Sequence, residues 1–267
     1  MQTDDKSLYS LQNKAFLSFL SRVARESGRL IASYFQGGYT VETKADATPV
    51  TIADRKAEEL LRRLITKEFP DHGIVGEEFG EDRPEAEYVW ILDPIDGTKS
   101  FIAGVPLFGT LVGLLYRGEP LIGLIANPIL KTVLCGDNTR TLLNGTPVRC
   151  RDCASLSEAV LSTTSPLGSR RSPWGNGFAA LTERVKLFRA WGDCFGYHLL
   201  ASGKIDLMLD PVMNKWDSLP LIPVIRGAGG VITTWTGKDP VQDPTNIVAA
   251  VPGIHREVIA TLSGSTT

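Results

Sequence analysis

The sequence predicts an α+β protein in which two parts of the chain form one compact unit. Two amphipathic helical segments come first and a run of strands follows, whereas strands and helices alternate in the second half. With 267 residues, 43% of them hydrophobic, the chain can bury a large core in one or two domains. We expect an N-terminal α+β part over residues 1–143, an α/β part over residues 144–267, and a cleft between them.

Both helices of the first half have readable ends. Apolar residues recur at helical spacing over residues 8–35, and Gly37-Gly38 then ends the pattern. Thr51-Ile52-Ala53-Asp54 is typical of a capping box, so a second helix is expected to begin there and to end before Pro70-Asp71. A short extended segment over residues 40–43 joins the two helices.

Short apolar runs bounded by turn residues predict the strands. In the first half they cover residues 74–75, 88–92, 107–115, 120–127 and 132–135, of which the last three form a meander. In the second half, strands are expected at 159–163, 185–188, 205–209, 231–234 and 246–250. Helices are expected at 177–184, 194–201, after Trp216 and at 255–262.

Charge and composition exclude several functional classes. The formal charge of −2 argues against an electrostatic binder of nucleic acid or membranes. The longest apolar stretches, residues 109–116 and 121–130, are shorter than the roughly 20 residues that span a bilayer. The polar, acidic N-terminus is unlike a secretory signal, so we expect a soluble cytoplasmic protein. The single C-x-x-C, Cys150 and Cys153, lacks further zinc ligands nearby and is expected to be a pair of surface thiols.

Three short segments are expected to place carboxylates directly after buried strands. The carboxylates lie in Gly76-Glu77-Glu78, in the segment from Leu92 to Thr98, and in Trp216-Asp217. Each segment alone reads as a solvated turn, a hairpin or a helix start, but clustered carboxylates ionise together only beside a counter-charge. Mg²⁺ prefers oxygen ligands, and the carbonyl of Ile95 offers one more.

A phosphate-binding turn overlaps the same residues. Gly97 allows a close approach of the backbone, and Thr98 is expected to begin a helix that runs toward Gly104. Because N–H groups at a helix start bind phosphate, the sequence indicates that metal and phosphate meet here.

These motifs resemble those of the inositol-monophosphatase superfamily. The resemblance rests on Gly76-Glu77-Glu78, on Trp90 to Thr98 and on Trp216-Asp217, with Lys44-x-Asp46 and Thr51-x-Ala53-Asp54 as its upstream motif. It spans roughly residues 35–252. It implies a layered αβαβα sandwich shared with fructose bisphosphatase, magnesium-dependent hydrolysis of small phosphate monoesters, and a homodimer.

One branch of the superfamily is most similar, the histidinol-phosphate phosphatases. Trp191 to Tyr197 and Met208 to Asp217 carry that similarity, and Asp193 and Asp210 lie where substrate contacts are implied. Histidinol phosphate bears an amine and an imidazole, both of which can be cationic, so acidic partners suit it. Arg226-Gly227 and Leu219-Pro220 depart from the family pattern and affect the expected pocket wall.

The resemblance implies a role for each candidate residue. Two or three Mg²⁺ ions are expected on Glu77, Asp93, the Ile95 carbonyl, Asp96 and Asp217. Glu77 and Thr98, with Asp54 in support, are expected to orient or deprotonate the attacking water. Substrate contacts are expected from Lys44, Glu77, Ile95, Asp96, Gly97, Thr98, Gly192, Asp193, Cys194, Asp210 and Asp217. His72, His198 and His255 lie outside the motifs and are expected at the surface or in the packing.

Two kinds of alternative stay open. The substrate could instead be inositol monophosphate, fructose bisphosphate or a phosphoadenosine nucleotide. A non-catalytic regulatory protein could also retain this fold, although the intact acidic set argues against it.

Overall fold

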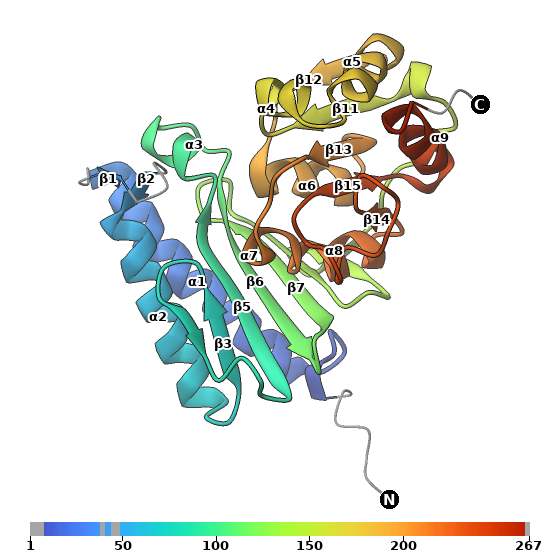
Figure 1. The fold of residues 1–267 in the computed structure, drawn as a ribbon. Helices are drawn as coiled ribbons and strands as arrows, with labels where there is room; N and C mark the ends of the chain where they lie inside the picture. Colours follow the sequence, from blue (N-terminus) through green and yellow to red (C-terminus); the bar gives the residue numbers. More distant parts are fainter. Residues whose placement is uncertain (1–7, 38–40, 44–48, 265–267) are drawn as a thin grey trace, which may run out of the picture.

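The computed structural model describes residues 8–37, 41–43 and 49–264 (Figure 1). Helices and sheets alternate in layers, as the resemblance implied: a helix pair, a large sheet, a group of shorter helices, a smaller sheet and an outer helix group. Among these described residues, no helix has the length and apolar character needed to cross a membrane.

The first layer consists of α1 (Lys14–Gly37) and α2 (Ile52–Glu68), which lie side by side along one face of the large sheet (Figure 1). The predicted capping box is confirmed. The Thr51 side chain accepts from the backbone at Asp54, and the Asp54 carboxylate accepts from the backbone amide of Thr51. Apolar residues of both helices pack against Trp90, Leu114 and other residues of the sheet. A two-stranded ribbon of β1 (Val41–Thr43) and β2 (Pro49–Thr51) joins them.

The large sheet has eight strands in the order β10-β9-β8-β7-β6-β5-β3-β4. Their bounds are β3 Gly73–Gly76, β4 Gly80–Asp82, β5 Tyr88–Asp96, β6 Gly109–Tyr116, β7 Glu119–Asn127, β8 Thr132–Gly136, β9 Thr141–Leu143 and β10 Thr146–Val148. All neighbours are antiparallel except β3 and β5. The predicted meander is confirmed and continues through β9 and β10. Residues 146–149 are strand-like in the sequence, which agrees with β10, whereas the three-residue strand β9 was not predicted.

Strand β5 is longer than predicted. We expected it to end at Leu92, but it continues through Pro94 to Asp96, with an irregular register between Asp93 and Asp96. The bulge is held by Thr110, whose Oγ1 donates to the carbonyl of Pro94 at 2.8 Å. Asp93 and Asp96 therefore lie within an irregular strand rather than in a loop after it. A bulge of this kind changes the direction in which the neighbouring side chains point.

The remaining layers come from the second half of the chain. The middle helices are α6 (Asp193–Ala201), α7 (Lys215–Ser218) and α8 (Leu221–Gly227). The five-stranded sheet has the order β12-β11-β13-β15-β14, with bounds Leu187–Arg189, Val160–Thr163, Leu207–Asp210, Ile247–Ala250 and Val231–Thr233. The outer helices are α4 (Pro166–Arg171), α5 (Gly175–Arg184) and α9 (Pro252–Leu262), while α3 (Thr98–Ile102) lies near the end of β5.

Two predictions about this half need correction. Asp217 does not follow a strand directly, because it lies in the short helix α7, beyond a loop that follows β13. Cys150 and Cys153 are partly buried against the main core rather than on the surface, and burial raises the pKa of Cys150 to about 11. A raised pKa disfavours the reactive thiolate, which agrees with a structural role.

Candidate active site

Three carboxylates from distant parts of the chain meet at the end of β5. Oxygen atoms of Asp93, Asp96 and Asp217 all lie within 4.8 Å of one another. Asp93 is 2% exposed, and the other two are half-buried. The sequence therefore identified three residues that the fold brings together.

Local hydrogen bonds fix the two aspartates of β5. The amide of Ile95 donates to Asp93 Oδ1 at 3.0 Å. The amide of Cys194, 98 positions further along the chain, donates to Asp96 Oδ2. Gly97 then turns the chain with φ of 90°, a left-handed conformation that glycine adopts without strain, and α3 begins at Thr98 as predicted.

Asp217 is oriented by the start of α7. Its Oδ2 accepts from the amide of Asn214 at 2.7 Å and the Asn214 side chain bonds in return, which forms a capping box. The pattern Asn-x-x-Asp is typical of a capping box. Asp217 was predicted from the sequence as a site residue, but the part of Asn214 in orienting it was not. The cap therefore restricts one oxygen of Asp217.

The cluster has the electrostatics of a cation site. Burial, followed by the charges of Glu77 and Asp96, raises the pKa of Asp93 well above its usual value. Burial and the charges of Asp193 and Asp217 do the same for Asp96. A divalent cation supplies the charge that lets such acids ionise together, and carboxylates are its preferred ligands. The residues present therefore fit a hard metal ion.

Thr98 and Asp54 form a second group beside the cluster. The hydroxyl of Thr98 lies 3.1 Å from the Ile95 carbonyl oxygen and 3.4 Å from Asp54 Oδ1. Asp54 Oδ2 accepts from the amide and the hydroxyl of Thr51, at 2.8 and 2.6 Å. Burial raises the pKa of Asp54, while the Thr51 hydrogen bonds oppose the rise. The helix cap of α2 thus holds a carboxylate against Thr98.

Glu77 lies in the turn between β3 and β4. Its amide bonds to the carbonyl of Leu92 at 3.1 Å, and its charge is one cause of the raised pKa of Asp93. It is not part of the tight group of three described above. The structure thus places Glu77 beside the cluster rather than within its closest set of oxygens.

The start of α6 lies against the end of β5 and the Gly97 turn. Gly192 precedes the helix, and Asp193 has φ of 52°. A carboxylate oxygen of Asp193 lies 3.0 Å from the point where a Cβ on Gly97 would stand. Burial raises the pKa of Asp193 to about 6, although the positive charge of Lys99 lowers it. Asp193 therefore lies against the expected phosphate turn.

Asp210 is a buried acid whose hydrogen bonds connect it to the start of α6. It is 4% exposed, and its oxygens accept from the Thr164 amide at 2.9 Å and from the Tyr197 hydroxyl at 3.0 Å. Burial raises the pKa of Asp210 to about 7. Because Thr164 Oγ1 also accepts from the Asp193 amide at 2.7 Å, Asp210 is joined to the start of α6. This placement favours a supporting role over the direct substrate contact we predicted.

Several other expectations concern residues away from the cluster. Lys44 lies outside the described residues. His72 is packed between aromatic rings and bonds to Trp90, and His198 is also buried, whereas His255 bonds to Thr233. These positions agree with packing roles for the histidines.

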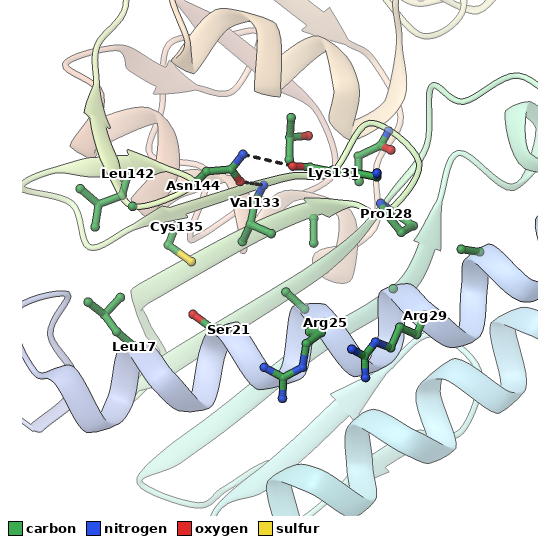
Figure 2. Close-up of a pocket in the computed structure, with 17 residues that line it drawn as sticks. Leu17, Ser21, Arg25, Arg29, Pro128, Lys131, Val133, Cys135, Leu142 and Asn144 are labelled. Atoms are coloured by element: carbon green, nitrogen blue, oxygen red, sulfur yellow. Dashed lines mark hydrogen bonds between the residues drawn. The ribbon is translucent and has the colours of Figure 1, made fainter.

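A cavity away from the acidic cluster lies between the first helix layer and the large sheet. Its volume is about 710 Å³, and it is bounded by α1 and by strands β7 to β9. Figure 2 shows Arg25 and Arg29 on the helix side and Val133, Leu142 and Asn144 on the strand side. None of the acidic cluster residues lines it.

Comparison with known proteins accounts for this arrangement. The chain matches the inositol monophosphatase family over residues 12–266. It is 44% identical to the bifunctional phosphatase IMPL2, chloroplastic, of Arabidopsis thaliana, over 92% of this chain and 75% of that protein. It is 36% identical to a histidinol-phosphatase of Chlorobaculum parvum, over 92% of this chain and 96% of that protein.

Among solved structures, an inositol monophosphatase from Zymomonas mobilis superposes with a TM-score of 0.80 at 34% identity, over 93% of this chain and 96% of that one. The family match covers every element that contributes to the acidic cluster. The chain therefore belongs to the inositol monophosphatase family and is a phosphoric monoester hydrolase.

Proposed function

We propose that this protein is a magnesium-dependent histidinol-phosphate phosphatase. Its reaction would be the hydrolysis of L-histidinol phosphate to L-histidinol and phosphate, a step of histidine biosynthesis. The observation that carries the choice of substrate is the Asp193 carboxylate, which lies against the Gly97 turn where the phosphate is expected. An acid there can meet the cationic part of a substrate whose phosphate is held next to it.

Asp93, Asp96 and Asp217 would hold the metal, with Glu77 and the Ile95 carbonyl as further oxygen ligands. When bound, Mg²⁺ supplies Lewis-acid activation of water and neutralises the charge on the phosphate. The amides of Gly97 and Thr98 would bind the phosphate oxygens. The number of ions, expected to be two or three, remains part of the proposal.

Thr98 and Asp54 would transfer the proton of the attacking water. The Thr98 hydroxyl can donate its hydrogen to Asp54 Oδ1, 3.4 Å away, and so leaves its oxygen lone pairs available to a water. Because the pKa of Asp54 is raised, this carboxylate is a stronger base than an exposed aspartate. Glu77, beside Asp93, would orient the same water.

Asp193 and Asp210 would act differently from each other. Asp193 would contact the amine or the imidazole directly. Asp210 would hold Thr164 and Tyr197, and through Thr164 it would fix the backbone of Asp193. We therefore propose Asp210 as a positioning residue rather than a substrate ligand.

Inositol monophosphatase is the second candidate activity. It is favoured by the close structural match to the inositol monophosphatase of Zymomonas mobilis. A neutral polyol, however, gives the Asp193 carboxylate no cationic partner.

A phosphate-release assay with a panel of substrates tests both proposals. Histidinol phosphate, inositol 1-phosphate, fructose 1,6-bisphosphate and a phosphoadenosine nucleotide would be compared with and without Mg²⁺. We expect magnesium-dependent release with the highest kcat/KM for histidinol phosphate. Faster hydrolysis of inositol phosphate would overturn the choice of substrate, and no release from any substrate would overturn the proposed function.

From the family resemblance we also propose a cytoplasmic homodimer without nucleic-acid or membrane partners. Light scattering of the purified protein tests the dimer, since a monomer at micromolar concentration would contradict it.

A further inference from the structure

We propose that Glu58 and Arg62, on one face of α2, are positioning residues that hold the Glu77 turn in place for metal binding. Neither residue belongs to the sequence motifs described above. They follow Asp54 at spacings of four and eight residues, so the three side chains share one face of the helix. The proposal rests on the proposed function for the role of Glu77 as a metal ligand and for its activity measurement, but not for the contacts that hold the turn.

Glu58 is a fully buried carboxylate whose partners lie in the turn. Its side chain has 0% exposure. Glu58 Oε2 accepts from the amide of Glu78 at 2.8 Å, and Oε1 accepts from the amide of Phe79 at 3.2 Å. A buried charge needs such partners, because an ionised carboxylate without them is strongly destabilising. Glu58 therefore has a defined position, and so does the turn that it binds.

Arg62 completes the contact on the other side of the turn. Its Nε donates to Glu58 Oε1 at 2.8 Å, and its Nη2 donates to the carbonyl of Gly80 at 2.5 Å. Backbone groups of the residues that follow Glu77 are thus bound by two side chains of α2. Charge-assisted bonds of this kind are about twice as strong as neutral ones.

Gly76 makes the close approach possible. A Cβ at this position would stand 2.1 Å from Glu58 Oε1 and 2.9 Å from Arg62 Nη2. Any side chain here would displace the two groups, so this packing requires a glycine immediately before Glu77.

The same helix face therefore controls two parts of the site. Its first turn holds Thr98 through Asp54, and its next two turns hold the Glu77 turn through Glu58 and Arg62. The spacing between Thr98 and Glu77 is then set by a rigid helix rather than by the flexibility of two loops. Side chains that orient metal ligands typically change metal affinity or activity about 10–100-fold when mutated.

The test compares Glu58→Gln and Arg62→Met with a matched control, Glu59→Gln, which alters the neighbouring exposed acid. Glutamine keeps the shape of Glu58 but points an NH₂ group at one of the three donors. Mg²⁺ would be titrated by calorimetry without substrate, and amide hydrogen exchange would be followed at residues 78 and 79. Phosphate release would be measured over a range of Mg²⁺ concentrations.

We expect Glu58→Gln and Arg62→Met to weaken Mg²⁺ binding about 10–100-fold and to speed exchange at residues 78 and 79. The Mg²⁺ concentration for half-maximal activity should rise in parallel, and Glu59→Gln should behave as wild type. If Glu58→Gln does not fold, the less buried Arg62→Met decides. A lowered melting temperature with unchanged Mg²⁺ affinity would overturn the proposal. If the wild-type protein binds Mg²⁺ but releases no phosphate, the proposed function is overturned instead. The Mg²⁺ titration of the variants then still tests this inference.

Discussion

Replacing Asp193 by asparagine separates substrate recognition from the chemistry at the metal cluster. Asparagine tolerates the left-handed backbone that Asp193 adopts at φ of 52°, and the backbone bond from residue 193 to Thr164 is retained. The substitution therefore removes a charge with little change of shape. Histidinol phosphate should lose its charge-assisted contact, whereas an aryl phosphate has no cationic group to lose.

The magnitude follows from the kind of contact that is lost. A hydrogen bond to a charged group contributes about 1.5–3 kcal/mol, which corresponds to about 10–150-fold in kcat/KM. We expect a loss of this size for histidinol phosphate and only a small change for p-nitrophenyl phosphate. Steady-state phosphate release at saturating Mg²⁺ measures both.

Asp71→Asn provides the control, since this exposed acid lies beyond the end of α2. It should leave both substrates unaffected. Asp193 also interacts with Lys99 and Ser100 of α3, which provides a purely structural alternative. Equal losses on the two substrates would show that this link, rather than recognition of a cation, is the function of Asp193.

Four further predictions concern the metal, the water and the buried acids. Asp93→Asn should abolish phosphate release and weaken Mg²⁺ binding in calorimetry while the fold survives; turnover near the wild-type rate would refute its role as a ligand. Thr98→Ala should lower kcat about 10²–10⁴-fold with Mg²⁺ affinity nearly unchanged, and altered affinity at a normal rate would reverse that assignment. Adding Mg²⁺ at 100 times its Kd should stabilise the metal-free protein by about 2.7 kcal/mol, seen as a higher melting temperature, and no shift would argue against the site. The pKa of Asp210 is raised from 3.8 to about 7, so the folded state binds this proton more tightly and the stability contributed by Asp210 falls as pH rises between those values. Relative to wild type, Asp210→Asn should therefore be more stable at pH 8 than at pH 4. The change is at most about 4 kcal/mol, because the shift of about 3 pKa units is worth about 1.4 kcal/mol per unit. A stability difference between variant and wild type that stays the same at both pH values in denaturant melts would contradict this.

Local signals explain why much of the fold could be predicted. The capping box from Thr51 to Asp54 depends on contacts within one helical turn, and the meander of β6 to β8 depends on short apolar runs with tight connections. Strand β5 was predicted too short because proline usually ends a strand, yet a bulge bonded to Thr110 carries it through Pro94. Neighbouring strands decided that outcome, not the local sequence.

The candidate site divides in the same way. The sequence by itself determined the chemistry, because Asp93, Asp96 and Thr98 lie within one short motif whose residue types already suit a metal and a phosphate. Only the tertiary structure brought Asp217 to that motif and buried Asp210 against Tyr197. Only the structure, too, showed Glu58 bonded to the turn that carries Glu77. Contacts between residues far apart in the chain depend on how layers pack, and periodicity and spacing report only on neighbours along the chain.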